Sequence, residues 1–182
     1  GPSILKQAGR KKDTMELLVK RAVRGDAESF IRLMETYKQS MLKVAWGFFS
    51  NQEDVADVMQ QTILNAYEHI GELKKTEYFK TWLIRILINN CNTLYHTQKR
   101  FQSQVELKEP GYLDSYPEEN SFFYLLSLLH RDDRVIFQLY FGEEYTTREI
   151  SEILNMKEST IRSRIHRGKE QLRKQIQREE WA

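Results

Sequence analysis

The chain has 182 residues, 40% of them hydrophobic, which is enough apolar material for one or two ordinary folded domains. Only 8 glycines and 3 prolines are present, and this scarcity favours helices over a turn-rich sheet protein. The single cysteine excludes an internal disulfide, and the 4 histidines are too dispersed for a metal site, so we expect no metal and no other cofactor. Because no apolar run approaches the ~20 residues of a membrane span and no signal-peptide core is visible, we expect a cytoplasmic protein with no membrane insertion of its own.

The net charge of +2 conceals four blocks of alternating sign. Residues 52–70 contain acidic side chains and neither lysine nor arginine, whereas residues 71–100 contain six basic and two acidic side chains. Residues 101–120 are acidic again, and residues 157–178 contain eight basic and two acidic side chains. Solvated helix faces could explain any one block. The alternation of all four indicates separate surfaces for separate partners.

Three helices are predicted in the first seventy residues. Residues 1–14 are interpreted as an expression tag or an N-terminal arm, and a short helix is predicted over residues 15–24. Asp26 is a suitable N-cap for a second helix, whose apolar residues step by three or four positions. A third helix follows a break at Asn51, and its predicted inner face is Val55, Val58, Met59, Thr62, Ile63, Ala66 and Tyr67.

A polar loop over residues 71–77 leads into a predicted fourth helix, which runs from Tyr78 to about Gln98 and is apolar enough in its first half to be buried. Residues 101–120 contain proline, glycine and several acids without helical periodicity, which predicts a flexible acidic linker. Helical periodicity resumes at residue 121. The predicted fold class is therefore all-α: a four-helix domain over residues 15–100, joined by the linker to a smaller domain over residues 121–182.

Residues 147–169 have the pattern of a helix-turn-helix with a basic second helix. Asn155 occupies the turn, where a positive φ is tolerated by asparagine, and Ser159 is the predicted cap of the second helix. Ile161 and Ile165 form its inner face, which leaves Thr160, Arg162, Ser163, Arg164, His166, Arg167 and Lys169 outward or on the flanks. The major groove accepts one α-helix, and arginine there can bind guanine with two hydrogen bonds. The pattern favours DNA binding, with a basic solvated hairpin as the alternative.

A second basic segment surrounds the start of the fourth helix. Tyr78, Phe79 and Trp82 lie beside Lys74, Lys75 and Lys80. Aromatic rings interleaved with lysines can stack on unpaired bases while the amines hold phosphates. Asparagines, His96, Lys99 and Arg100 further along offer a polar edge for bases. Aromatics at helical spacing are more often core residues, and on this segment alone the core interpretation is favoured.

The order and spacing of these segments resemble the extracytoplasmic-function (ECF) sigma factors of bacterial RNA polymerase. Arg24-Gly25-Asp26 matches the opening of the family, and Asp54, Val55, Asp57, Val58, Gln60 and Thr62 match its polymerase-binding helix. Phe79 to Leu83, then Arg85-Ile86 and Asn89, match its promoter-melting helix, and Thr160 to Arg164 with Arg167 match its helix that reads the minus-thirty-five element. The chain departs from frequent family residues at Gln61, Thr93, His130 and Asn155.

The resemblance implies a promoter-specificity subunit for stress or cell-envelope genes, without catalytic activity. Its expected partners are core RNA polymerase, through the clamp helices and the flap, promoter DNA and an anti-sigma factor. The expected polymerase-binding residues are Asp54, Asp57, Gln60, Gln61 and Asn65. The expected contacts to the minus-ten element are Lys74, Lys75, Tyr78, Phe79, Lys80, Trp82, Arg85, Asn89, Asn90, Thr93, His96, Lys99 and Arg100. The expected upstream contacts are Ser159, Thr160, Arg162, Ser163, Arg164, His166, Arg167 and Lys169.

Two other classes of protein account for less of the sequence. An ordinary helix-turn-helix regulator that binds duplex operator DNA would explain the C-terminal segment, but neither the acidic third helix nor the segment around Phe79. An enzyme is disfavoured because the sequence has no nucleophile elbow, phosphate loop or metal cluster.

Overall fold

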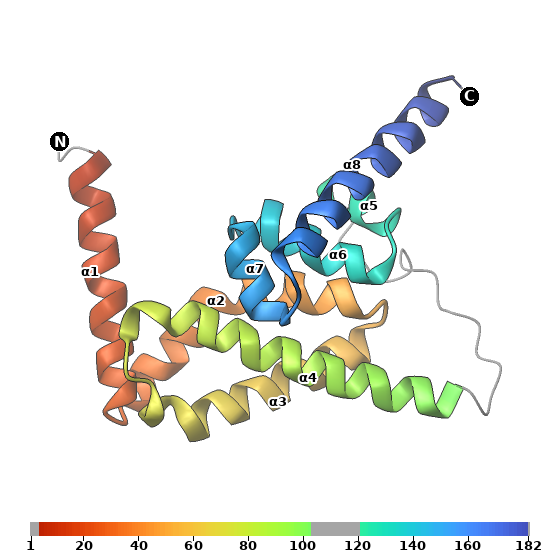
Figure 1. The fold of residues 1–182 in the computed structure, drawn as a ribbon. Coiled ribbons are helices and arrows are strands. Elements are labelled where there is room, and N and C mark those ends of the chain that lie inside the picture. The colour runs from red at the N-terminus through yellow and green to blue at the C-terminus, as the bar shows by residue number, and fades with distance from the viewer. Residues whose placement is uncertain (1–3, 103–120, 182) are drawn as a thin grey trace.

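A computed structural model describes residues 4–102 and 121–181, and within these ranges every element is helical (Figure 1). Four long helices come first: α1 (Ile4–Val23), α2 (Ala27–Phe48), α3 (Gln52–His69) and α4 (Phe79–Gln102). Two short 3₁₀ turns, η1 (Ile70–Glu72) and η2 (Thr76–Tyr78), lie between α3 and α4. The remaining elements are α5 (Ser121–Ser127), α6 (Arg131–Phe137), the π-helical turn η3 (Gln138–Gly142), α7 (Thr147–Leu154) and α8 (Glu158–Trp181).

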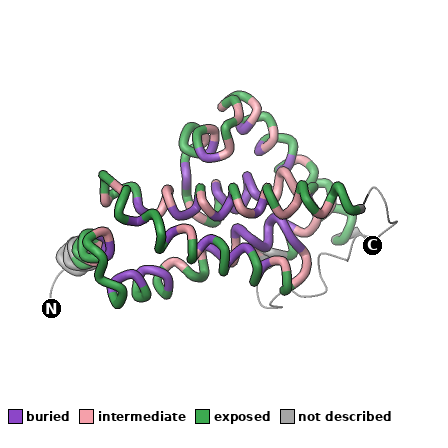
Figure 2. Tube along the Cα trace, turned by 90° about the horizontal axis from the view of Figure 1, so that it is seen from below, coloured by how far each residue is buried: buried purple, intermediate pink, exposed green. Residues whose placement is uncertain are grey.

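The N-terminal half is a bundle in which α2, α3 and α4 turn their apolar faces toward one another. Figure 2 shows these inward faces as the buried parts of the trace. Burial of such stripes is the main source of stability for amphipathic helices. The predicted inner face of α3 is largely confirmed, but Tyr67 is wrong: its side chain is exposed and its ring lies edge-on against Phe30. The fully buried side chains at the centre of the bundle include Leu33, Met41, Leu83, Ile84, Leu87 and Ile88.

Several helix ends differ from the prediction. α1 begins at Ile4, so the helix predicted over residues 15–24 was too short at its start. Asn51 does cap α3: its side-chain oxygen accepts a hydrogen bond from the backbone N–H of Asp54 at 2.9 Å. α4 continues to Gln102, two residues into the predicted linker, and the rest of that linker lies outside the described residues.

The C-terminal half packs three helices around buried isoleucines and Phe137. Gly168 of α8 lies so close to Phe137 of α6 that a Cβ there would be 2.5 Å from two ring carbons. This glycine lets α8 cross α6 at short distance. Beyond that crossing α8 continues alongside α5 (Figure 1): Gln171 donates a hydrogen bond to the Leu128 carbonyl at 3.1 Å, and Glu179 accepts one from the Tyr124 hydroxyl at 2.5 Å.

The two halves are packed against each other, with α6 and α7 lying beside α2 and α4 (Figure 1). Val135 of α6 approaches Gly47 of α2 closely enough that a Cβ on the glycine would be 3.4 Å from the valine side chain. The Arg131 guanidinium stacks on the Tyr95 ring of α4, with 3.2 Å between its Cζ atom and the ring centroid. This contact between the two halves was not predicted from the sequence.

Among the described residues, no helix has the length and apolarity of a membrane span, and no group of side chains is suited to hold a metal ion.

Candidate nucleic-acid and polymerase interface

The helix-turn-helix is held by local hydrogen bonds at both of its turns. Thr146 and Glu149 form a capping box at the start of α7: each side chain accepts a hydrogen bond from the backbone N–H of the other. Asn155 ends α7 with φ 53° and ψ 51°, which confirms the left-handed turn residue. α8 then begins at Glu158, so Ser159 lies in its first turn and the prediction of Ser159 as the cap was wrong.

The face of α8 that points away from the protein is basic and slightly hollowed. Ile161 and Ile165 are buried on the inner side, as predicted. Ser159 and Lys169 are exposed, and Thr160 is half-buried. The exposed residues Arg162, Ser163, His166 and Arg167 line a shallow depression of about 630 Å³.

Arg164 does not share that face. Its side chain is largely buried, and its Nη1 lies 3.7 Å from carboxylate oxygens of both Asp132 and Asp133 at the start of α6. Arg164 therefore ties α8 to α6, and its predicted contact with DNA stays a prediction.

The exposed residues of α4 form a stripe along one side of the helix. Arg85, Asn89, Thr93, His96 and Arg100 follow one another at steps of three or four, and all five are exposed. We call these five residues the α4 stripe. The loop before α4 carries the exposed Lys74, Lys75 and Tyr78, so it lies on the N-terminal side of the stripe. Lys99 is exposed beside its far end. These are the side chains that a nucleic acid could reach.

Three other predicted contacts on α4 face the protein. Phe79 is only 1% exposed and packs against Tyr37 and Trp82, so in this structure its ring belongs to the core of the bundle. Trp82 itself is half-buried. The Asn90 amide donates hydrogen bonds to Thr62 and Asn65 of α3, which makes it a contact between helices.

The predicted polymerase-binding residues also divide into exposed residues and residues that contact the rest of the protein. Asp57, Gln60 and Gln61 are exposed on α3. Asp54 is half-buried and accepts a hydrogen bond from the Asn51 amide at 2.6 Å, so it belongs to the cap of the helix. Asn65 is engaged with Asn90. Only the first three residues lie on an open surface.

Lys80 has a role that the sequence did not reveal. Its Nζ lies 2.8 Å from the Glu143 carboxylate, which comes from the C-terminal half and whose side chain is 5% exposed. The same carboxylate accepts a hydrogen bond from Ser40 of α2 at 3.0 Å. Burial alone would lower the pKa of Lys80, but the hydrogen bond and the charge of Glu143 outweigh it and raise that pKa above its ordinary value. Lys80 is thereby turned toward the protein.

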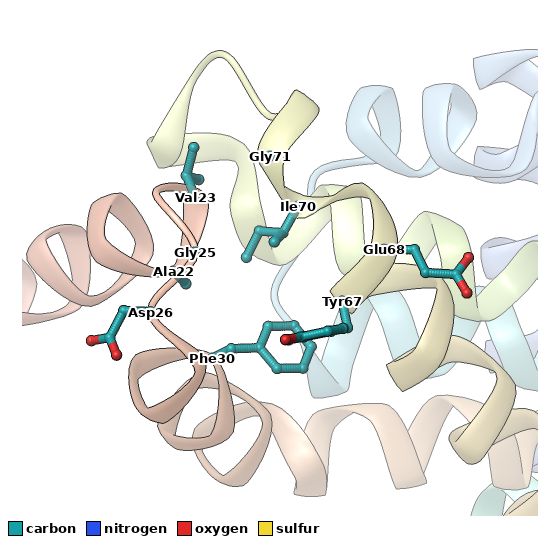
Figure 3. A pocket seen from close by; sticks show the side chains of 9 residues that line it. All are labelled: Ala22, Val23, Gly25, Asp26, Phe30, Tyr67, Glu68, Ile70 and Gly71. Carbon is teal, nitrogen blue, oxygen red and sulfur yellow. The ribbon is translucent and has the colours of Figure 1, made fainter.

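A separate pocket of about 280 Å³ lies where the end of α1, the start of α2 and the end of α3 meet (Figure 3). The rings of Phe30 and Tyr67 lie together at one side, while the carboxylates of Asp26 and Glu68 point away from them. Asp26 also accepts a hydrogen bond from Ser29 at 2.6 Å. The pocket is a seam between helices, and its polar groups do not converge on a ligand.

Comparison with known proteins gives the same division of the chain. Residues 33–101 match the family described as Sigma-70 region 2, and residues 121–172 match Sigma-70, region 4. The ECF RNA polymerase sigma factor SigW of Bacillus subtilis is 26% identical, over 89% of this chain and 98% of that protein. The ECF RNA polymerase sigma-E factor of Escherichia coli is also 26% identical, over 90% of this chain and 95% of that protein.

Two solved structures share the fold. One is CnrH in complex with the cytosolic domain of CnrY, with a TM-score of 0.65 and 20% identity over 90% of this chain and 97% of that one. The other is the sigma factor RpoE in complex with the anti-sigma factor NepR from Bartonella quintana, with a TM-score of 0.69 and 18% identity over 83% of this chain and 98% of that one.

The helical fold and the helix-turn-helix of region 4 define a DNA-binding protein. Region 2 accounts for α3 and α4, which an ordinary helix-turn-helix regulator would leave unexplained. The chain belongs to the ECF sigma factors, which associate with RNA polymerase, recognise promoters and so initiate transcription.

Proposed function

We propose that this sigma factor holds promoter DNA with two helix faces, one in each half of the chain. The outer face of α8 enters the major groove of the upstream, minus-thirty-five element. The α4 stripe and the loop before it hold the unpaired strand of the minus-ten element. The division of α4 supports this proposal most directly, because its stripe of Arg85, Asn89, Thr93, His96 and Arg100 is exposed while the apolar residues between them are buried.

Each face has side chains suited to its substrate. On α8, Arg162 and Arg167 can donate to guanine, and Ser163, Thr160 and Lys169 suit phosphates. On α4, the Asn89 amide both donates and accepts hydrogen bonds, which fits the edge of an unpaired base. Tyr78, 55% exposed beside Lys75, offers a ring on which a base could stack.

The polymerase-binding surface proposed here is the open part of α3, formed by Asp57, Gln60 and Gln61, and its partner is the pair of clamp helices. The C-terminal half would contact the flap. A direct test is retention of core polymerase by the tagged chain carrying Asp57→Lys. Glu35→Lys makes the same charge change on the exposed surface of α2 and is the matched control. We expect the first variant to lose polymerase and the second to retain it; equal retention by two folded variants would contradict the assignment.

The packing of the two halves suggests that the chain alone is closed. Glu143 withdraws Lys80 from solvent, and Arg131 covers the Tyr95 ring beside the α4 stripe. In this arrangement the chain alone would bind duplex promoter DNA weakly, and core polymerase would make binding specific by separating the halves. Tight, sequence-specific and dimeric binding by the isolated chain in a mobility-shift assay would instead favour an operator-binding regulator.

The domain limits, a further partner and the cellular location are proposed from membership of the family. The proposed domain limits are residues 15–100 and 121–182, with the acidic segment of residues 101–120 between them. An anti-sigma factor is a further proposed partner, supported by the complexes of CnrH with CnrY and of RpoE with NepR. Transcription initiation also supports a cytoplasmic location and a set of stress or cell-envelope genes as targets.

A further inference from the structure

The start of α8 carries an acidic residue where a DNA-reading helix would be expected to avoid one. Glu158 is the first residue of α8, and its Oε1 accepts a hydrogen bond from Arg162 Nη2 at 2.6 Å. The same oxygen accepts a hydrogen bond from the Thr147 hydroxyl, at the first residue of α7, at 3.0 Å. Glu158 therefore joins both helices of the helix-turn-helix to one arginine of the exposed face.

The two partners differ in how much of each reaches solvent. The Glu158 side chain is 35% exposed, whereas that of Arg162 is 66% exposed. The carboxylate is thus anchored at the junction of α7 and α8, while most of the guanidinium remains open beside Ser163 and His166. Guanidinium has five N–H donors in a rigid plane, so donors remain after Glu158 has accepted one hydrogen bond.

This arrangement has two consequences for binding DNA. A guanidinium already held at one edge loses less side-chain entropy when it forms hydrogen bonds to a base. The carboxylate also repels phosphates, and its pairing with Arg162 opposes the swing of that arginine toward the backbone of the duplex. Both consequences favour reading of a base over sequence-independent attachment.

We propose that Glu158 is a positioning residue that fixes Arg162 for one base of the upstream element and suppresses its contact with phosphates. The inference rests on the proposed DNA-reading role of the outer face of α8. It predicts an unusual combination: loss of this acidic residue strengthens binding to DNA in general and weakens discrimination at one base pair.

The test uses holoenzyme reconstituted from core polymerase and the full chain. Competition binding would be measured on duplexes carrying each single substitution across the upstream element, at several salt concentrations. We expect Glu158→Gln to lower the preference at one position by about tenfold, within the range for one bidentate contact, and to raise affinity for unrelated duplex DNA. Arg162→Ala should lose the preference at the same position, and the double variant should lose little more, since both changes remove one interaction.

Glu170→Gln is the matched control, because Glu170 lies on the same helix and also pairs with an arginine one turn away, Arg173, at 2.6 Å. It removes the same charge and should leave every base preference unchanged. A purely structural role for Glu158 would lower stability in urea denaturation without a change confined to one base position.

Two results would overturn different parts of the account. If Arg162→Ala loses a base preference that Glu158→Gln retains, Glu158 does not position it. If Arg162→Ala retains all base preferences, the proposed reading face of α8 is itself wrong.

Discussion

The ion pair between Lys80 and Glu143 makes the closed arrangement testable by a single substitution, Glu143→Gln. Lys80 Nζ lies 2.8 Å from Glu143 Oε2, which corresponds to a gross attraction of about 6 kcal/mol at an effective dielectric constant of about 20. Desolvation offsets much of this attraction. The Lys80 side chain is 34% exposed and can be rehydrated, so breaking this pair should cost less than breaking a fully buried one. We expect the closed arrangement to lose about 2 kcal/mol of stability. That loss would lower the ratio of closed to open chains by roughly thirtyfold.

The distance between dyes at Lys38→Cys on α2 and Lys174→Cys on α8 reports this opening in the intact chain. Cys91 is buried, so the introduced cysteines would take the label. We expect Glu143→Gln to increase the population with long distances, and Glu144→Gln, which changes the adjacent exposed carboxylate, to leave it unchanged. Lys80→Met should act like Glu143→Gln. Identical distance distributions for Glu143→Gln and the parent chain would refute the role of the pair in closure.

Three further predictions follow from the packing. Gly168→Ala should lower the free energy of unfolding by about 1–3 kcal/mol in urea denaturation, because its Cβ would be 2.5 Å from the Phe137 ring, and Phe137→Leu should recover part of the loss. Asn155→Ala should cost about 1 kcal/mol at a φ of 53°, whereas Asn155→Gly should not, as thermal melting would show. Burial raises the pKa of the Cys91 thiol, so the unfolded chain loses this proton first; stability should fall as the pH rises above about 8.5, and less so in Cys91→Ala.

Most features that the sequence predicted correctly depend on local signals, although the local signal at Ser159 was misleading. The break at Asn51, the left-handed Asn155 and the buried Ile161 and Ile165 each follow from a cap, a turn or helical spacing over a few residues. Such signals act through neighbouring backbone groups, so they can be recognised without knowledge of the tertiary fold.

The sequence did not determine which of the predicted contact residues face the core and which face solvent. Phe79, Arg164 and Asn90 are residue types that serve both nucleic-acid contacts and protein cores, and only the positions of α2, α3 and α6 decide between the two. Periodicity also placed Tyr67 inside, although it lies at the edge of the apolar face and is 56% exposed.

The contact between the halves was beyond reach for a different reason. Glu143 and Lys80 are 63 positions apart, and nothing in their local sequence marks them as partners. Because Lys80 lies in the basic block of residues 71–100, it was expected to contact DNA. Its burial beside a carboxylate becomes visible only when the loop after η3 is placed against α2 and α4.

We propose that the two halves perform separate steps: α8 binds the upstream element, and α4 holds the opened strand. The most direct measurement is permanganate footprinting of unpaired thymines by reconstituted holoenzyme, beside filter binding on linear promoter DNA. Arg162→Ala should lose about 1–3 kcal/mol of upstream binding and relax one base preference. Asn89→Ala should retain duplex binding, lose permanganate reactivity and recover on a premelted template. If Asn89→Ala loses duplex binding while Arg162→Ala binds normally and fails to open, the assignment of the two halves is inverted.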